Sequence, residues 1–148
     1  MGKHFDIGYF KKPVKVRGKV AKERSVLNKI KAWELGKDYY DGNRLNGYGG
    51  FKYDGRWQNM LPKIIKRYKL TSKSKVLDLG CKKGFLLKDL NILLPGINSV
   101  GIENHSYALK NSVKCQSKLV QSEYYKIPFK DNYFDFVIAF NSLYMYNL

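Results

Sequence analysis

The stretch Lys75–Asn91, KVLDLGCKKGFLLKDLN, decides the fold of this chain. It opens with an apolar run that contains one acid, Asp78, and continues through a turn bracketed by Gly80 and Gly84. Beyond Gly84 the apolar residues are spaced as on one face of a helix. We therefore predict a buried strand, a tight glycine turn and a helix. Together they form a small crevice beside the tip of the strand.

Asp78 determines what kind of ligand suits this crevice. A dinucleotide site usually spaces its glycines as G-x-G-x-x-G, so that the backbone can approach a pyrophosphate. Here the glycines are Gly80 and Gly84, and residue 82 is a lysine. A carboxylate repels phosphate but favours a ligand that carries an amine, a sulfonium and hydroxyl groups. An NAD-dependent enzyme is therefore a weak alternative.

The same stretch resembles the first motif of the class I S-adenosylmethionine (SAM) dependent methyltransferases, whose usual form is V-L-D-x-G-C-G-x-G. The resemblance implies that Asp78, Gly80 and Gly84 lie at the methionine end of SAM, and we count Cys81 among the cofactor-binding residues. Lys82 takes the place of the family's middle glycine. Either its side chain points to solvent and the loop still closes on SAM, or SAM binding is weakened.

A second acid stands where a parallel nucleotide-binding fold needs one. Asn98–Ile102 is predicted as the second strand, and Glu103 follows it, about 20 residues beyond the glycine turn. An acid there can accept hydrogen bonds from both ribose hydroxyls. Glu103 matches the family's second motif, which implies a contact with the ribose of SAM. Asn104 is added to the cofactor-binding residues beside it.

The next segment supplies the expected adenine contacts. A helix is predicted over Ser106–Ser117, and a brief third strand follows at Lys118–Gln121. The turn after this strand lies where the family has a loop against the adenine. By that resemblance Glu123 accepts a hydrogen bond from the exocyclic amine, and the backbone of Tyr124 meets the ring.

The fourth predicted strand, Phe134–Phe140, is apolar apart from Asp135, as expected for a strand covered on both faces. Asn141 follows it as the candidate catalytic residue, which either contacts the methionine end or the methyl acceptor, or caps the next turn. The family's sheet has seven strands in the order 3-2-1-4-5-7-6, and only four can be placed before Leu148. We therefore expect a truncated domain whose fourth strand offers an edge for self-association or for a partner chain.

Upstream of the glycine turn we expect an irregular arm over residues 1–20, a helix over Ala21–Leu35 and a structured loop over Asp38–Trp57. The segment GYGGFKYDGRW in this loop also resembles a subset of methyltransferases, often ones near sugar or lipid modification. Its Arg56 suits a bidentate contact with the carboxylate of the methionine moiety. The alternative is an aromatic lid without ligand contacts. A short amphipathic helix, Trp57–Tyr68, should cover the sheet.

Composition narrows the remaining classes. Twenty-eight Lys and Arg residues against twelve Asp and Glu give a formal charge of +16, which suits a polyanion but also a lysine-rich solvated surface. We found no apolar run of about 20 residues and no secretory signal, so we expect a cytoplasmic protein without a membrane partner. Cys81 and Cys115 are too isolated for a metal site, and none is predicted.

The sequence as a whole predicts an α/β fold, a Rossmann-like, doubly wound and mostly parallel sheet with an N-terminal helical and loop extension. We divide it into residues 1–57, the arm, helix and lid, and residues 58–148, an incomplete SAM-binding domain. The expected function is methyl transfer from SAM to a small-molecule or sugar-type acceptor. The alternatives are a non-catalytic SAM-binding or interaction fragment and a basic RNA-binding or RNA-methylating module; nucleic acid is not the favoured partner.

Overall fold

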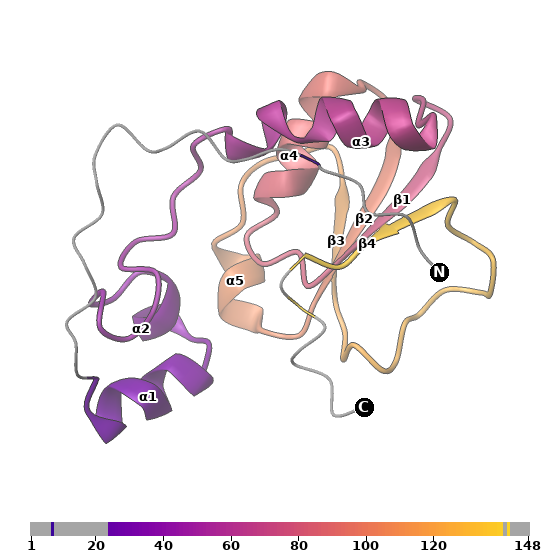
Figure 1. Cartoon of the computed structure of the whole chain (residues 1–148). Coiled ribbons are helices and arrows are strands. Elements are labelled where there is room, and N and C mark those ends of the chain that lie inside the picture. Colours follow the sequence, from indigo (N-terminus) through magenta and orange to yellow (C-terminus); the bar gives the residue numbers. More distant parts are fainter. Residues whose placement is uncertain (1–6, 8–23, 141, 143–148) are drawn as a thin grey trace, which may run out of the picture.

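The computed structural model describes residues 7, 24–140 and 142. Asn141 and, apart from Ile7, the arm predicted at residues 1–20 lie outside this part of the chain. The elements in chain order are α1 (Val26–Trp33), α2 (Lys37–Tyr40), η1 (Arg56–Asn59), α3 (Leu61–Tyr68), β1 (Lys75–Leu79), α4 (Phe85–Leu93), β2 (Asn98–Glu103), α5 (Ser106–Lys110), β3 (Lys118–Gln121) and β4 (Phe136–Ile138). One parallel sheet forms the centre; α3 and α4 lie over it, whereas α1 and α2 lie to one side of it (Figure 1).

The sheet has the strand order β3-β2-β1-β4, and all of its pairs are parallel. This confirms the first four places of the order expected from the resemblance. Leu79 of β1 pairs with Ile102 of β2, and Glu103 pairs with Gln121 of β3. The carboxyl ends of the two central strands therefore meet at one edge of the sheet, where open parallel sheets bind their ligands.

Alternate residues of the central strands face two separate apolar clusters. Leu77 and Leu79 of β1 pack with Ile102 and with Tyr124 from the segment that follows β3. Val76, on the opposite face of β1, packs in the larger cluster with α3, α4 and the lid. Because side chains of a strand alternate between faces, Asp78 lies on the same face as Val76, toward α4 and the lid.

The strand-turn-helix unit forms as predicted. Gly84 adopts a left-handed φ of 75° as the N-cap of α4, and this helix ends before Pro95. At the other end of the unit, Asp135 explains why β4 begins only at Phe136. Its carboxylate accepts a hydrogen bond from the backbone amide of Lys75 at 2.7 Å. The strand predicted over Phe134–Phe140 thus starts two residues later, and it also ends two residues earlier, at Ile138.

The glycine- and aromatic-rich segment over residues 38–57 packs down on the domain, as predicted. Tyr40, Phe51 and Trp57 are buried in the same cluster as Phe85 of α4, and the rings of Phe51 and Phe85 stack at 4.5 Å. The expected loop is interrupted by a single helical turn, α2, and it ends in the 3-10 helix η1. From here on we call residues 38–57 the lid.

Three predicted helices are shorter than expected. The helix placed over Trp57–Tyr68 is divided into η1 and α3, and α3 begins only at Leu61. The helix placed over Ala21–Leu35 begins at Val26, because Ser25 caps it in a capping box, and it stops at Trp33, before Leu35 takes a left-handed φ of 47°. The helix placed over Ser106–Ser117 ends at Lys110, where the chain turns and the amide of Val113 donates to the Lys83 carbonyl.

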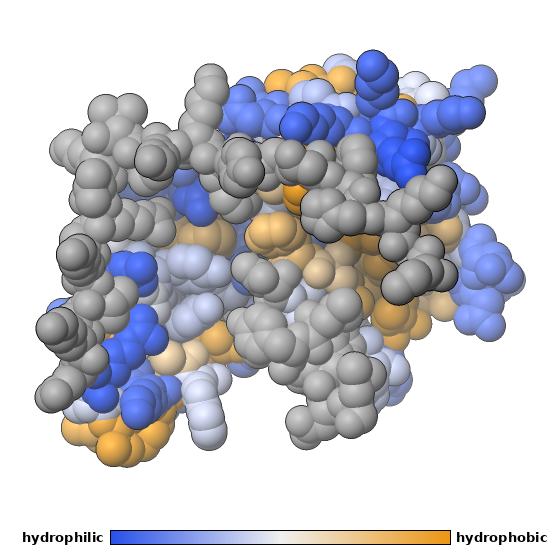
Figure 2. Space-filling view, viewed as in Figure 1, coloured by the Kyte–Doolittle hydropathy of each residue, from blue (hydrophilic) through white to orange (hydrophobic). Residues whose placement is uncertain are grey.

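Burial also corrects one expectation. The fourth strand is covered less than predicted, because Val137 of β4 is 50% exposed. The apolar residues of α1 are exposed too, and they form an orange patch at the lower left of the molecule (Figure 2). Within the part of the chain that the structure describes, no helix is both long and apolar enough to span a membrane.

Candidate functional site

A pocket of about 150 Å³ opens at the carboxyl end of β1, between the glycine turn and the lid. Its wall combines one carboxylate and two cations with aromatic rings. Ligand pockets in proteins usually measure about 300–1,000 Å³, so this one takes one end of a nucleoside-sized ligand. The lining residues are Tyr48, Phe51, Arg56, Trp57, Asp78, Gly80, Cys81, Lys82, Phe85, Leu86 and Phe140.

Asp78 is the acid of this pocket, and it is only 4% exposed. Among residues 24–140, no group donates a hydrogen bond to its carboxylate and no cation lies within 4.0 Å of it. Burial raises the pKa of Asp78 to about 7, against the opposing effect of the Lys82 ammonium and with a contribution from the Glu103 carboxylate. A buried acceptor without a donor is costly, so the site is complementary to a ligand that brings a donor or a positive charge.

The glycine turn uses its amides within the protein. The amides of Gly80 and Cys81 both donate to the carbonyl of Ile102, at 2.8 and 3.0 Å, and the amide of Lys82 donates to Glu103. A phosphate-binding turn needs these amides free to face the anion. The turn therefore offers no phosphate cradle, which is consistent with the carboxylate of Asp78 beside it.

Glu103 joins the turn to the end of β2. It is 2% exposed, and its Oε2 atom accepts from the Lys82 amide at 2.9 Å. Its Oε1 atom accepts from the Tyr124 hydroxyl at 2.9 Å and from the amides of Asn104 and His105. Burial and the Glu103 carboxylate raise the pKa of Tyr124 well above its usual range, so this hydroxyl stays protonated as the donor.

The lid is fixed to the glycine turn by an ion pair between a buried lysine and an exposed aspartate. Lys83, which is 6% exposed, donates to both carboxylate oxygens of Asp41 at 2.8 and 2.6 Å and to the carbonyl of Phe51. The hydroxyl of Tyr107 from α5 donates to the same carboxylate. Burial opposes ionisation of Asp41, but the hydrogen bonds from Lys83 and Tyr107 outweigh it and lower the pKa of Asp41.

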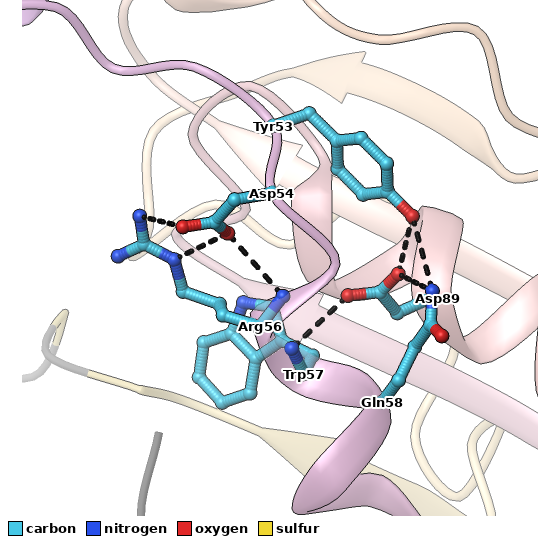
Figure 3. A network of polar contacts seen from close by, with 6 residues as sticks. All are labelled: Tyr53, Asp54, Arg56, Trp57, Gln58 and Asp89. Atoms are coloured by element: carbon cyan, nitrogen blue, oxygen red, sulfur yellow. Dashed lines mark hydrogen bonds and ion pairs between the residues drawn. The ribbon is translucent and has the colours of Figure 1, made fainter. Parts of the chain in front are cut away.

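A second contact fixes the lid to α4 (Figure 3). Asp89 of α4 is fully buried, and it accepts hydrogen bonds from the Tyr53 hydroxyl, the Trp57 amide and the Gln58 side chain. The corresponding distances are 2.5, 3.0 and 3.0 Å. These bonds place the ring of Trp57 in the wall of the pocket.

Arg56 lines the pocket, as the sharper of the two sequence-based interpretations requires. Its guanidinium makes two bonds of 2.8 Å with the carboxylate of Asp54, also drawn in Figure 3. The side chain is therefore oriented by its neighbour in the lid. The guanidinium group lies at the pocket, and some of its N–H donors are already used in these hydrogen bonds.

The structure brings some of the predicted site residues together and leaves others apart. Asp78, Gly80, Cys81 and Arg56 line one pocket, and burial raises the pKa of the Cys81 thiol, which excludes a reactive thiolate. The remaining predicted residues lie beside this pocket or away from it. Glu103 and Tyr124 form the adjacent buried network, Gly84 caps α4, Asn104 follows β2 with a buried side-chain oxygen, Glu123 is exposed, and Asn141 is not among the described residues.

Sequence reasoning missed the two groups that hold the lid. Asp89 carried a usable signal, because it lies on the apolar face of α4 between Leu86 and Leu90, where an acid needs internal partners. Lys83 carried none. A lysine next to a glycine turn is ordinarily exposed, and its partner Asp41 lies 42 residues earlier in the chain.

Residues 77–147 match the family model described as a methyltransferase domain, which is nearly half of the chain. The match begins inside β1 and includes the glycine turn, Glu103 and β4. This part of the chain is therefore similar to methyltransferase domains, in agreement with the resemblance that the glycine turn and Glu103 carry. A search of curated proteins found no match.

Solved structures agree with the fold. A proposed S-adenosyl-L-methionine-dependent methyltransferase from Methanococcus maripaludis is 18% identical, with a TM-score of 0.55, over 61% of this chain and 44% of that one. A proposed methyltransferase in complex with a Haloferax volcanii methyltransferase activator is 19% identical, with a TM-score of 0.50, over 78% of this chain and 46% of that one. The chain thus spans less than half the length of either protein.

The residues at the site fit the amino-acid end of SAM. The carboxylate of Asp78 lies in the pocket without an internal donor, and the side-chain oxygen of Asn104 is buried without a partner among the described residues. SAM carries an ammonium group, ribose hydroxyls and an adenine amine, which are donors of the kind that these oxygens lack. Among the described residues, no group of three His, Cys, Asp or Glu side chains is arranged to hold a metal ion.

Proposed function

We propose that this chain binds SAM at the carboxyl end of β1 and transfers its methyl group to a small-molecule or sugar-type acceptor. The observation that carries the proposal is the carboxylate of Asp78, which is buried in the pocket and accepts no hydrogen bond from the residues that the structure describes. In its ionised form it binds the ammonium group at the methionine end. SAM supplies an activated methyl group on its sulfonium, and the protein contributes mainly by holding the two reactants in line.

Glu103 is proposed to accept the ribose hydroxyls. Its carboxylate sits at the end of β2, next to the turn that carries Asp78, and the Lys82 amide already orients it. In this structure the hydroxyl of Tyr124 donates a hydrogen bond to one oxygen of the Glu103 carboxylate. A ribose hydroxyl would replace that hydroxyl, with one donor exchanged for another.

The acceptor would approach from the lid. Tyr48, Phe51 and Trp57 contribute aromatic rings to the pocket wall, a surface against which a sugar ring or a small apolar molecule packs well. The two contacts through Lys83 and Asp89 hold this wall against the cofactor-binding turn. The lid therefore encloses the reacting groups, and the shape of its aromatic wall determines which acceptors fit.

The edge of β4 is proposed as the place for a further strand. β4 pairs with β1 on one side, and within the described residues no strand pairs with its other side. Val137 at this edge is half exposed, and an apolar unpaired edge favours pairing with another strand. The strand would come from a second copy or from a partner chain. Light scattering should show an assembly larger than the monomer, and Val137→Lys should dissociate it.

The test of the main proposal is calorimetric titration of the folded chain with SAM. We expect micromolar binding that is lost in Asp78→Ala and Glu103→Ala but retained in Asp131→Ala, which removes the same charge from an exposed loop. A folded wild-type chain that binds no SAM would contradict the proposal. It would favour the interaction fragment or an RNA-binding module, and the latter would show RNA affinity that falls steeply with salt.

A further inference from the structure

Lys82 stands in the place of the middle glycine of the methyltransferase motif, and its structure suggests a role of its own. We propose that Lys82 is a specificity-determining residue that binds the carboxylate of the amino-acid end of the cofactor, in the same pocket as Asp78. The pocket would thus bind a zwitterion, the ammonium at Asp78 and the carboxylate at Lys82. This inference rests on the proposed function and deepens it.

The backbone of Lys82 is the first observation. Its φ is 54°, in the left-handed region that a glycine occupies without strain. For a residue with a side chain, this conformation costs about 1–2 kcal/mol. The Lys82 amide is held there by its hydrogen bond to Glu103. A side chain carried on a strained backbone at a ligand pocket, where glycine would be relaxed, suggests that the side chain itself is used.

The arrangement of charges is the second observation. Lys82 and Asp78 line the same pocket, and Lys82 is half-buried. No ion pair within 4.0 Å joins them, nor does any carboxylate among the described residues pair with Lys82. The ammonium nevertheless acts electrostatically on Asp78, because it lowers that pKa in part. Lys82 and Asp78 therefore place opposite charges in one cavity without forming an ion pair, beside an Arg56 guanidinium that the Asp54 carboxylate already binds. An amino-acid zwitterion has the pair of charges that complements Lys82 and Asp78.

A simple anion does not fit this arrangement as well. Phosphate would pair with Lys82 but would be repelled by the carboxylate of Asp78. The amides of the turn cannot bind it either, because they already donate hydrogen bonds to Ile102 and Glu103. A simple cation would pair with Asp78 and be repelled by Lys82. Only a ligand that carries both charges is favoured by both side chains.

The experiment compares two ligands that differ only in the carboxylate. Calorimetry with SAM and with decarboxylated SAM gives the ratio of their dissociation constants for the 148-residue chain. We expect SAM to bind at least about tenfold more tightly, as a charge-assisted contact in a buried site suggests. Lys82→Met should reduce the ratio to within about twofold, and Lys82→Arg should preserve most of it. The matched control is Lys69→Met, at a second left-handed lysine, exposed at the end of α3.

The outcomes separate the two proposals. A wild-type chain that is folded by circular dichroism but binds neither ligand overturns the proposed function and this inference together. SAM binding with a ratio near one, or with a ratio unchanged in Lys82→Met, overturns this inference alone. Should Lys82→Met not fold, the wild-type ratio and Lys82→Arg decide: a ratio near one in the wild type, or a loss of preference in Lys82→Arg, contradicts the role of the ammonium.

Discussion

The ammonium nitrogen of Lys83 lies 2.6 Å from the Oδ2 atom of Asp41, and this ion pair joins the cofactor-binding turn to a lid that precedes it by some 40 residues. Lys83 is almost fully buried, and Phe51 and Tyr107 complete the hydrogen bonding around the pair. Removing one partner of such a pair leaves a charge without compensation. The packed structure of the lid and that of the glycine turn should therefore depend on each other.

Lys83→Met tests this coupling. We expect the free energy of unfolding to fall by about 1–2 kcal/mol, because Asp41 loses the hydrogen bonds from the ammonium but stays in contact with solvent. Urea unfolding measures this change, and limited proteolysis should cleave the lid faster. Lys63→Met on the exposed side of α3 is the control and should change stability by less than about 0.5 kcal/mol. Equal stability of the two variants would contradict a role for the pair in holding the lid.

Asp89→Asn tests the contact of the lid with α4. The carboxylate accepts three hydrogen bonds in a fully buried site, whereas an amide accepts on one oxygen and turns its own donors toward another donor. We expect a loss of about 2–3 kcal/mol in thermal or urea unfolding. Asp131→Asn, at an exposed acid, serves as the comparison and should leave the unfolding midpoint where it is.

Asp78 should make the stability of the chain depend on pH. Its pKa rises from 3.8 to about 7 on folding, so between these values the folded state binds the proton that the unfolded state has lost. Stability therefore falls as the pH rises from about 4 to about 7, by about 2–4 kcal/mol in total. Asp78→Asn should remove this slope and stabilise the chain at pH 8. If the free energy of unfolding depends on pH between 4 and 7 in the same way in the wild type and in Asp78→Asn, the raised pKa of Asp78 is refuted.

The affinity for SAM should follow the same group in the opposite direction. Binding of the ligand's ammonium needs the ionised carboxylate, so affinity should rise about tenfold per pH unit below pH 7 and level off above it. Calorimetry between pH 5.5 and 8.5 measures the profile. The dependence should be absent from whatever weak binding Asp78→Asn retains.

Tyr124→Phe tests whether this hydroxyl occupies the position of a ribose hydroxyl. Its bond to Glu103 must be exchanged when a ribose binds, so its removal should tighten SAM binding by about two- to tenfold. Circular dichroism confirms folding, and calorimetry gives the affinity. Tyr125→Phe, at an exposed neighbour, should have no effect. Weaker binding in Tyr124→Phe would mean that the hydroxyl supports the ligand rather than competing with it.

Gly101→Ala tests the close contact of β2 with the glycine turn. A Cβ atom at this position would lie 2.6 Å from Cys81 Sγ and 2.7 Å from Leu87 Cδ1, which forces the turn away from the sheet. We expect a loss of about 1–3 kcal/mol in stability. The control is Gly36→Ala, where the nearest atom lies 4.0 Å away. Similar midpoints for both variants in urea would show that the turn can adjust.

Much of the fold could be predicted because its signals are local. Lys118–Gln121 was predicted as a strand and is β3 residue for residue, and the β1-turn-α4 unit follows from its apolar run, its glycines and its helical spacing. Helix ends were less accessible. The ends of α1 and α5 depend on the Ser25 cap and on the bond between Val113 and Lys83, which neither periodicity nor composition reveals.

The candidate site shows the same division. Asp78 and Glu103 were predicted from their positions at the ends of two strands, because parallel strands bring their carboxyl ends to one edge. The state of each carboxylate could not be predicted. Glu103 accepts four internal hydrogen bonds, whereas Asp78 accepts none from the described residues. The difference depends on Tyr124 and on the turn, which reach Glu103 only in the folded chain.

The sequence by itself determined the strands, the glycine turn and the two acids at the edge of the sheet, because apolar runs and turn residues act over short stretches of chain; the order of the strands was implied by the family resemblance. Only the tertiary structure decided which charges are neutralised. Lys83 pairs with Asp41, and Asp89 binds the lid, whereas Asp78 and Lys82 line the pocket without an ion-pair partner in the described part of the chain. Pairing and burial depend on groups that lie far apart in the sequence, and no local pattern records them.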